Sequence, residues 1–246
     1  MVLAAGQGTR LRPITDRMPK ALVPVAGRPM IEFALLLLRR HGIRDIVINL
    51  HHFGSQIEKH LGDGQSFDVN ISYSHEAELL DTGGGLLKAK AFLQDDTFIV
   101  INTDALIDVD LASVLKVHRL KHAAATLVLR PDADADRYGS IDIDADGRIC
   151  RFLEHQSQSQ PIGAVRKLMF TGLQILEPRV FEYMDGGALK KFSTTKETYP
   201  RMLHAGDRVF GYCFEGFWQD LGTMERIAEA ERKLSRGQAQ LHFLSP

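Results

Sequence analysis

The chain has 246 residues, of which 44% are hydrophobic and 25% are charged, a composition that is typical of a folded globular protein and excludes intrinsic disorder. Its 30 basic residues against 31 acidic ones give a net charge of −1, whereas proteins whose main partner is a nucleic acid usually carry a basic excess. No apolar run approaches the roughly 20 residues that cross a bilayer, and the first residues lack the pattern of a signal peptide. We therefore expect a cytoplasmic protein with no membrane or nucleic-acid partner.

Strand-like and helix-like segments alternate over the first 130 residues. Runs of β-branched and aliphatic residues, such as DIVINL at 45–50, predict buried strands, and apolar residues three or four positions apart predict helices between them. Repeated strand–helix–strand units favour a mostly parallel sheet with helices on both faces. The expected strands are 2–5, 45–50, 69–73, 97–102 and 125–129, and the expected helices are 28–41, 54–61, 84–92 and 111–122.

After residue 130 the pattern changes to short alternating strands between polar loops. The expected elements are strands at 140–143, 149–153, 168–175 and 208–214, a polar surface loop at 155–165, and a closing helix at 224–234. The sequence contains no repeat and no Pro- or Ser-rich linker long enough to divide domains. It therefore predicts one α/β domain over residues 1–246, with a Rossmann-like, mixed and mostly parallel sheet.

A glycine-rich turn follows the first strand in the run LAAGQGTRLRP. Its glycines, Gly6 and Gly8, would let backbone N–H groups converge on a phosphate, and Arg10 and Lys20 add positive charge. A dinucleotide-binding fingerprint is excluded because its third glycine position holds Leu11, and a Walker loop is excluded because the chain has no Gly-Lys-Ser/Thr. The pattern predicts a different kind of polyphosphate site.

The run LAAGQGTRLRP, followed by PKALVPVAGRPMIEF, resembles the N-terminal signature of the sugar-phosphate nucleotidyltransferases. That family includes mannose-1-phosphate guanylyltransferases, glucose-1-phosphate thymidylyl- and uridylyltransferases, and N-acetylmuramate-1-phosphate uridylyltransferases. The resemblance implies a nucleotide-diphospho-sugar transferase (GT-A-like) fold, with a nucleotide-binding half at 1–130 and a sugar-binding half at 131–246. It also implies Mg²⁺ as cofactor, with a nucleoside triphosphate and a sugar 1-phosphate as the partners that form a nucleotide sugar and pyrophosphate.

By this resemblance, the glycine-rich turn wraps the triphosphate. Arg10 would bind the pyrophosphate leaving group, and Lys20 would contact the α-phosphate and the incoming sugar phosphate. Both are expected to be catalytic, together with Asp104, because cations and a metal must cancel the repulsion between two reacting anions. The turn residues expected to bind the nucleotide are Ala4, Ala5, Gly6, Gly8 and Thr9.

Two aspartates are the expected Mg²⁺ ligands, because this hard cation prefers oxygen. Asp104 follows the strand at 97–102, at the sheet edge where ligands of α/β proteins collect, and matches the family's metal aspartate. Asp220 in FWQDLGT matches the second metal aspartate, in the family's W-x-D-x-G-T motif. A lone aspartate after a strand is more often a turn or cap residue, but two aspartates in matching motifs favour the metal site.

The run DTGGG at 81–85 is expected to hold the nucleobase, as it does in the family. Thr82 and Gly83 are the candidates for this site, with Glu78 and Gln56 as weaker ones. The run is most similar to those of the N-acetylmuramate-1-phosphate uridylyltransferases and some mannose-1-phosphate guanylyltransferases. The expected substrates are therefore UTP with N-acetylmuramic acid 1-phosphate, followed by GTP with mannose 1-phosphate or a related heptose.

The sugar site is expected at four positions. Gly139 matches the glycine of the family's Tyr-Gly pair, Glu154 a hydroxyl acceptor, and Thr171 the far wall of the pocket. Trp218 is expected either to stack on the sugar or to pack in the core. Many relatives have a lysine after the glutamate to hold the sugar phosphate, but here Glu154 is followed by His155. The groups that could replace that lysine are His155, Arg137 and Lys167, or Lys20 together with the metal.

Two other functions compete with a sugar-phosphate nucleotidyltransferase. A non-catalytic nucleotide- or sugar-binding regulatory subunit would keep the fold but lose the cation and metal positions. This chain retains all four of them: Arg10, Lys20, Asp104 and Asp220. A pyrophosphorylase for a cofactor or isoprenoid precursor would share only the start of the glycine-rich turn. The C-terminal β-helix of longer relatives is absent, so a single activity is expected, while the oligomeric state is not predicted.

Overall fold

The computed structural model consists of two compact units whose segments alternate along the chain. Unit 1 comprises Met1–Leu79, Ile101–Val109 and Gly216–Pro246, and unit 2 comprises Leu80–Val100 and Asp110–Glu215. The residues that the structure describes are 1–132, 139–184 and 190–244. The units do not coincide with the halves expected on either side of residue 130, and the single-domain organisation stays a prediction. Among the described residues, no helix has both the length and the apolar character that crossing a membrane requires.

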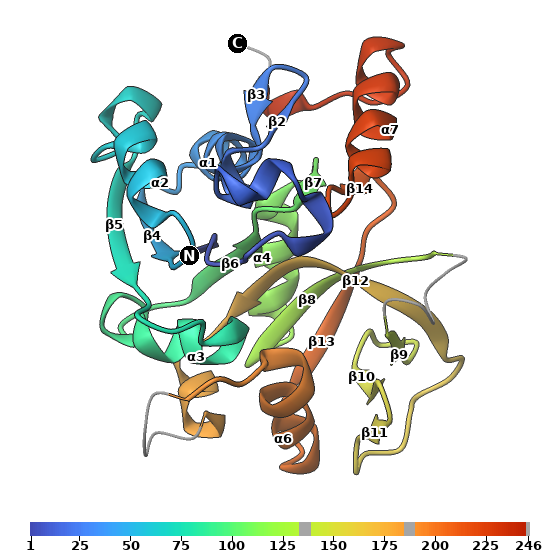
Figure 1. The fold of residues 1–246 in the computed structure, drawn as a ribbon. Coiled ribbons are helices and arrows are strands. Elements are labelled where there is room, and N and C mark those ends of the chain that lie inside the picture. Colours follow the sequence, from blue (N-terminus) through green and yellow to red (C-terminus); the bar gives the residue numbers. More distant parts are fainter. Residues whose placement is uncertain (133–138, 185–189, 245–246) are drawn as a thin grey trace. The chain divides into compact units, whose positions relative to one another are not determined.

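Unit 1 contains a parallel sheet (Figure 1). β1 (Val2–Leu3) pairs in parallel with β4 (Asp45–Leu50) on one side and with the end of β6 (Phe98–Asn102) on the other. β5 (Asn70–His75) pairs in parallel with β4, which gives the order β6–β1–β4–β5. Because the carboxyl ends of parallel strands share one edge, the glycine-rich turn after β1 lies beside Asp104, which follows β6.

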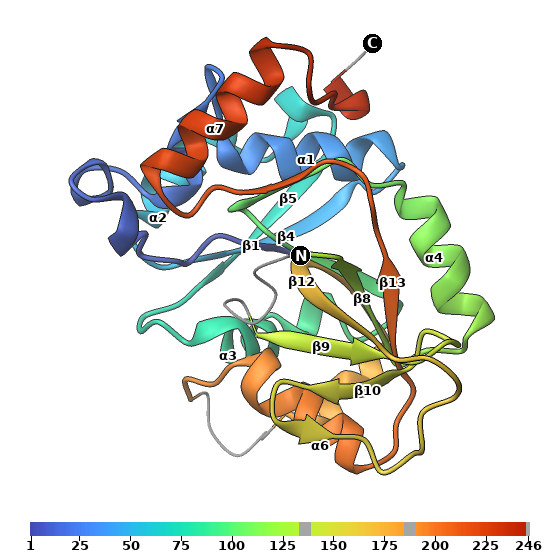
Figure 2. The ribbon, with the colours of Figure 1, turned by 90° about the vertical axis from the view of Figure 1, so that its right-hand side faces the viewer.

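Three helices pack within unit 1: α1 (Met30–Arg40), α2 (Gly54–Leu61) and α7 (Met224–Ser235). α1 is buried on all sides over most of its length, in keeping with its nearly continuous apolar sequence. α7, the red helix of Figure 2, packs against the hairpin of β2 (Pro24–Val25) and β3 (Arg28–Pro29). The Ala26 N–H of this hairpin donates to Glu231 Oε1 over 2.9 Å. Short 3₁₀ helices occupy Thr9–Leu11, Ile14–Asp16, Lys20–Leu22, Gln65–Phe67 and His242–Leu244.

A short antiparallel pair joins two distant parts of unit 1. β7 (Ala105–Ile107) pairs with β14 (Trp218–Asp220), and Asp220 lies opposite the first residue of β7. The Leu221 N–H donates to the carbonyl oxygen of Asp104 over 2.8 Å and extends this pairing. The pair therefore places the two aspartates expected to bind metal next to one another.

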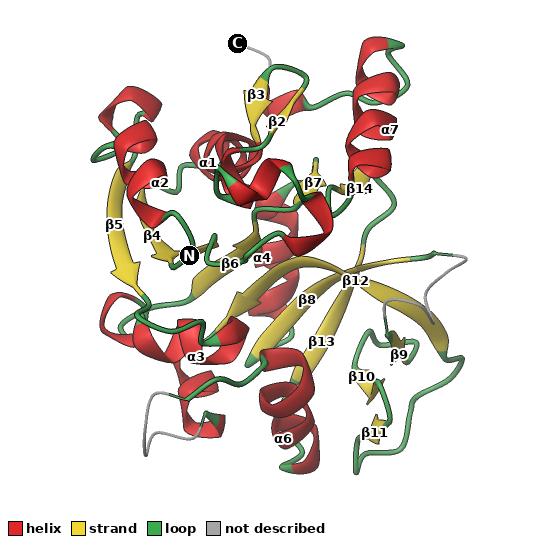
Figure 3. Cartoon of the chain, in the orientation of Figure 1, coloured by secondary structure: helices red, strands yellow, loops and turns green. Residues whose placement is uncertain are grey.

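Unit 2 contains a mixed sheet built around the long strand β12, coloured yellow with the other strands in Figure 3. β12 pairs antiparallel with β8 and β9, β8 pairs in parallel with β13, and β10 and β11 follow β9 in antiparallel order. The bounds of these strands are β8 Ala125–Arg130, β9 Ser140–Ile143, β10 Ile149–Phe152, β11 His155–Gln156, β12 Arg166–Leu176 and β13 Val209–Cys213.

The helices of unit 2 within the described residues are α3 (Asp81–Lys88), α4 (Leu111–Leu120) and α6 (Tyr199–His204), with 3₁₀ helices at Lys90–Phe92 and Pro178–Tyr183 and a π-helical turn at Thr194–Thr198. Tyr199 is fully buried, its ring centroid lies 5.5 Å from that of Phe152, and its hydroxyl donates to Gln174. Burial raises the pKa of the Tyr199 hydroxyl, which therefore stays protonated. α4 is capped by Asp110, whose carboxylate accepts from the Ala112 N–H over 3.1 Å.

A buried histidine joins α4 to the sheet of unit 2. His118 is 1% exposed, and its Nε2 lies 3.0 Å from Glu177 Oε1 while its Nδ1 lies 2.8 Å from Thr126 Oγ1. A carboxylate only accepts, so Nε2 carries the proton and Nδ1 accepts from the threonine hydroxyl. Burial lowers the pKa of His118 below its ordinary value of 6.5, against the opposing effect of the Glu177 carboxylate.

The structure confirms the predicted α/β fold with a mixed, partly parallel sheet. The elements expected at 45–50, 54–61 and 140–143 have the same bounds in the structure, and most others differ only at their ends. The expected start of the first helix at residue 28 is wrong, because Arg28 and Pro29 form β3. The expected helix 84–92 instead begins at Asp81 and ends at Lys88, and the expected loop at 155–165 begins with strand β11. The sequence did not predict the β2–β3 hairpin, the β7–β14 pair or α6.

Candidate active site

The glycine-rich turn has a shape that only glycine permits at one position. Gly8 has φ +65°, and a Cβ there would lie 2.8 Å from Thr15 Cγ2 and 2.9 Å from Lys20 Cβ. Its carbonyl oxygen accepts from the Leu11 N–H and from the Thr15 hydroxyl, each over 2.8 Å. Gly6, by contrast, has no atom within 4 Å of the place where a Cβ would be. Gly8 therefore fixes the turn, whereas Gly6 leaves the backbone open to a ligand.

Two buried polar side chains fix the backbone at the start of the turn through hydrogen bonds. The Ala4 N–H donates to Asn49 Oδ1 over 2.8 Å, and Asn49 Nδ2 donates to Glu76 Oε1 over 2.7 Å. Both side chains belong to buried residues, so these hydrogen bonds are shielded from water. These two hydrogen bonds were not predicted from the sequence, although the polar Asn49 inside the apolar strand DIVINL was a signal for them.

Lys20 and Asp104 form a close ion pair. Lys20 Nζ lies 2.5 Å from Asp104 Oδ2, with only 13% of the lysine side chain and 27% of the aspartate side chain exposed. Asp104 lies two residues after the end of β6, at the carboxyl edge of the sheet where the sequence predicted it. The ammonium group expected to contact phosphates is thus already next to a carboxylate expected to hold metal.

Arg10 and Asp220 meet at Gly222. A Cβ on Gly222 would lie 2.5 Å from Arg10 Nη2, 2.8 Å from Arg10 Cζ and 2.9 Å from Asp220 Oδ1. The Gly222 N–H also donates to Asp220 Oδ1 over 2.9 Å. The glycine of the W-x-D-x-G-T motif therefore leaves the space in which the guanidinium group lies beside the carboxylate.

A fifth charged side chain, which the sequence analysis did not predict, joins these four. Arg226 Nη1 forms an ion pair with Asp220 Oδ2, and both side chains are largely buried. Arg226 lies in the first turn of α7, three residues after the end of the W-x-D-x-G-T motif. We call the set the charged cluster. Its members, all in unit 1, are Arg10, Lys20, Asp104, Asp220 and Arg226.

The charged cluster fits a magnesium ion. Mg²⁺ in proteins is commonly bound by one or two carboxylates together with waters and substrate phosphates rather than by a full protein cage. Asp104 and Asp220 supply two such carboxylates. Within the ranges that the structure describes, no group of three or more His, Cys, Asp or Glu residues could hold a metal by itself. The donor set thus suits an ion that arrives with phosphate oxygens.

The residues expected to hold the base lie in unit 2 and already contact their own unit. A Cβ on Gly83 would overlap the Phe192 ring, and the Gly83 N–H donates to the Phe192 carbonyl oxygen over 2.9 Å. The Thr82 hydroxyl accepts from the Thr194 N–H over 3.0 Å. Close packing accounts for Gly83 without any ligand, and the base-binding role of Thr82 and Gly83 stays a prediction. The weaker candidates lie in unit 1, where Glu78 is exposed and Gln56 donates to the Arg17 carbonyl oxygen.

Three of the four sugar-site candidates lie in unit 2. Gly139 has φ +88°, and a Cβ there would overlap Leu153, the residue before the exposed Glu154. The structure thus brings Gly139 and Glu154 into one neighbourhood. Thr171 is 2% exposed, and its hydroxyl donates to the Val128 carbonyl oxygen over 2.7 Å, which ties β12 to β8. Trp218 lies in unit 1 on β14, where it is half-buried.

The possible replacements for the missing sugar-phosphate lysine are placed differently. The imidazole ring of His155 contacts that of His204, with centroids 5.8 Å apart, and Lys167 is exposed on β12 opposite Asp142. Arg137 lies outside the described residues. The sugar-site assignments therefore stay predictions.

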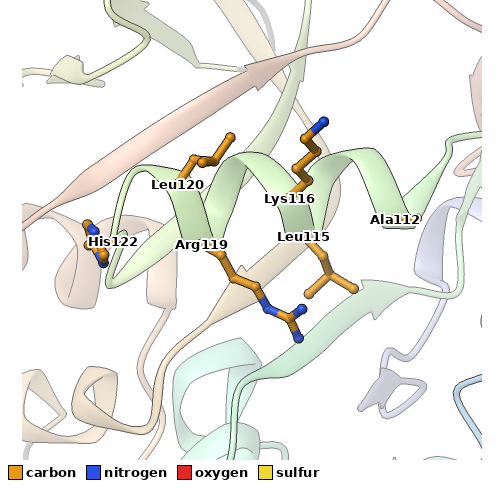
Figure 4. A pocket seen from close by; sticks show the side chains of 6 residues that line it. All are labelled: Ala112, Leu115, Lys116, Arg119, Leu120 and His122. Atoms are coloured by element: carbon orange, nitrogen blue, oxygen red, sulfur yellow. The ribbon is translucent and has the colours of Figure 1, made fainter.

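A hollow of about 510 Å³ on α4 contains none of the predicted site residues. Figure 4 shows its side chains distributed around the helix, with Lys116 and Leu120 on one side and Leu115 and Arg119 on the other. Polar groups that converge on one point distinguish a small-molecule site from an ordinary surface depression. The hollow lacks such convergence, and the charged cluster is the better candidate.

Comparison with known proteins identifies the family. The model of the family described as nucleotidyl transferase matches residues 1–237. The chain belongs to the nucleotidyl transferase family. A solved structure of a candidate glucose-1-phosphate thymidylyltransferase from Bacillus anthracis matches with a TM-score of 0.79 and 25% identity, over 96% of this chain and 94% of that one. The family membership and this structural match agree with the fold derived above.

Curated members of the family differ in substrate. A UTP–glucose-1-phosphate uridylyltransferase from Synechocystis is 36% identical over 94% of this chain, and a mannose-1-phosphate guanylyltransferase from Mycobacterium tuberculosis is 32% identical over 96% of it. The chain spans only 62% and 64% of the lengths of these two relatives. An N-acetylmuramate α-1-phosphate uridylyltransferase from Neisseria meningitidis is 35% identical over 94% of this chain and 96% of its own length. Similar identities to three different enzymes leave the substrate open.

Proposed function

We propose that the protein is a sugar-1-phosphate nucleotidyltransferase. An oxygen of the sugar phosphate attacks the α-phosphorus of a nucleoside triphosphate, the bond from that phosphorus to the bridging oxygen breaks, and pyrophosphate leaves. The observation that supports this proposal is the charged cluster, which gathers Arg10, Lys20, Asp104 and Asp220 from three separate segments of the chain. An attack of one anion on another requires such a concentration of cations and carboxylates.

The side chains of the cluster have distinct tasks in this proposal. Lys20 lies against Asp104 and would neutralise the α-phosphate and the incoming sugar phosphate. Arg10, exposed at the end of the turn and beside Gly222, would hold the departing pyrophosphate. The open backbone at Gly6 would let amide groups approach the triphosphate. Asp104 and Asp220 would hold Mg²⁺, which would supply positive charge to the phosphate oxygens when bound.

For the substrates, we propose UTP and N-acetylmuramic acid 1-phosphate. The Neisseria relative of that activity is 35% identical to this chain over 94% of it. The DTGGG run supports the same choice. The alternative is GTP with mannose 1-phosphate or a heptose 1-phosphate, which the 32% identity to the Mycobacterium enzyme keeps open.

A non-catalytic regulatory subunit is the competing function from another class. A subunit without catalytic activity would not require the ion pair between Lys20 and Asp104 or the position of Arg10 beside Asp220. A pyrophosphate-release assay separates the two functions, with UTP, GTP, dTTP, CTP and ATP each paired with N-acetylmuramic acid, mannose and glucose 1-phosphates in the presence of Mg²⁺. We expect release with one preferred pair and none from Asp104→Asn. A purified, folded protein that binds a nucleotide but releases no pyrophosphate with any pair would support the regulatory function instead.

A further inference from the structure

Arg226 occupies a position that the chain fixes firmly. It lies in the first turn of α7, where the Thr223 side chain caps the helix by accepting from the Arg226 N–H over 3.4 Å. Its guanidinium group reaches back to Asp220, and only 18% of its side chain and 13% of that of Asp220 are exposed. An ion pair shielded to this degree is weakly screened by salt, so it exerts a strong electrostatic effect on whatever else approaches the carboxylate.

Each of the two carboxylates of the charged cluster forms an ion pair, and Arg10 lies beside Asp220 as a third cation. Lys20 contacts Asp104, and Arg226 contacts Asp220. The two cations differ in mobility, because Lys20 ends in a compact ammonium group on a flexible stem, whereas Arg226 is a planar guanidinium on a capped helix. Two carboxylates that are both neutralised in this way attract a divalent ion far less than two bare ones would. The ion must compete with the resident cations for carboxylate oxygens.

We propose that Arg226 is a positioning residue that holds the Asp220 carboxylate in the metal-free protein and competes with the divalent cation for it. Arg226 thereby keeps the affinity for free metal low. A triphosphate adds about four negative charges to the cluster, and the metal that arrives with it can displace Arg226 from Asp220. This role rests on the proposed function, because it assigns Asp220 to a metal.

The competition is tested with Mn²⁺ alone, in the absence of nucleotide, by electron paramagnetic resonance of free Mn²⁺ on the full chain. Arg226→Met removes the charge and keeps much of the volume, and we expect it to bind Mn²⁺ about tenfold more tightly than the wild type. Arg226→Lys keeps a positive charge and should bind at nearly the wild-type affinity. The matched control is Arg232→Met, which removes one exposed positive charge from the same helix and should change nothing. Adding Asp220→Asn to Arg226→Met should abolish the gain.

The outcomes are separable. Binding by Arg226→Met that is equal to or weaker than that of the wild type, including no binding by either, would overturn the role of Arg226. An equal gain in Arg232→Met would also overturn it, because net charge alone would then explain the effect. Circular dichroism checks the fold of each variant, and Arg226→Gln replaces Arg226→Met if the latter does not fold. If the wild type releases pyrophosphate but Arg226→Met shows no gain in Mn²⁺ binding, the proposed function stands and the role of Arg226 does not. If Arg226→Met binds Mn²⁺ more tightly but the wild type releases no pyrophosphate, only the competition for Asp220 stands.

Discussion

Replacing Gly222 by alanine tests whether the space at the W-x-D-x-G-T motif exists for Arg10. The new Cβ would stand 2.5 Å from Arg10 Nη2 and 2.9 Å from Asp220 Oδ1, both too close for unbonded atoms. Asp220 is fixed by its ion pair and by the β7–β14 pairing, whereas Arg10 is exposed and ends a flexible side chain. The guanidinium group should therefore move away, while the fold is retained.

The size of the expected loss in activity follows from the phosphate contact that we propose for the displaced Arg10 guanidinium group. A charge-assisted hydrogen bond to a phosphate contributes about 1.5–3 kcal/mol, so its loss should lower kcat/KM by roughly 10- to 150-fold. The free energy of unfolding should fall by less than about 1 kcal/mol, because an exposed side chain can relocate into water. Pyrophosphate release gives the first quantity and urea unfolding gives the second.

A double-mutant cycle shows whether the loss passes through Arg10. If Gly222→Ala acts only by displacing Arg10, it should have almost no further effect on kcat/KM in an Arg10→Ala background. Wild-type activity in Gly222→Ala would refute the reasoning. So would additive losses in the double variant, because the alanine would then be acting on Asp220 or on the backbone.

Three further predictions concern other parts of the structure. Asp104→Asn should lower kcat by at least about 100-fold with little change in the free energy of unfolding, and a variant that keeps wild-type turnover would contradict the role of this carboxylate. Asn49→Ala leaves the Ala4 N–H and Glu76 without their partner and should cost about 2–3 kcal/mol in urea unfolding, whereas Asn70→Ala, which loses only an exposed hydrogen bond, should cost far less. Burial lowers the pKa of His118 below 6.5 in the folded protein. As the pH falls, this histidine is therefore protonated in the unfolded chain before it is protonated in the folded one. The contribution of His118 to the free energy of unfolding is therefore complete above about pH 6.5. Below that pH, this contribution decreases by up to about 1.4 kcal/mol per pH unit. In urea unfolding, His118→Gln should reduce the dependence of the free energy of unfolding on pH, whereas the exposed His204→Gln should not. Equal slopes in His118→Gln and the wild type would argue against the prediction.

The site residues whose positions could be expected from the sequence are those that depend on local pattern, while their roles stay predictions. Asp104 follows a buried apolar strand, and Arg10 and Lys20 follow a turn whose glycines are two positions apart, so a short stretch of chain was enough to expect charge at the sheet edge. The position of Asp220 beside Asp104 needed the resemblance, because β14 is too short to be predicted from its pattern. The same reason explains why the β7–β14 pair was missed.

The residues that the sequence did not predict depend on partners far away in the chain. Arg226 has the sequence context of an ordinary exposed helix residue, and only the fold brings it to Asp220. Thr15 is unremarkable in a polar stretch, yet it is 1% exposed and holds the carbonyl of Gly8. The sequence context of Gly83 suggested a ligand, which stays a prediction, but it gave no sign that Phe192 packs against this glycine. Pairings of this kind are set by tertiary structure, which local pattern does not encode.

The alternation of the two units along the chain has a consequence for biosynthesis. Arg10 and Lys20 leave the ribosome first, Asp104 follows, and Asp220 and Arg226 emerge only with the last segment of unit 1. At about 5–20 residues per second, Arg10 precedes Asp220 by roughly ten seconds or more. A nascent chain released before residue 216 would therefore carry the glycine-rich turn without Asp220 and Arg226, and so would lack two members of the charged cluster.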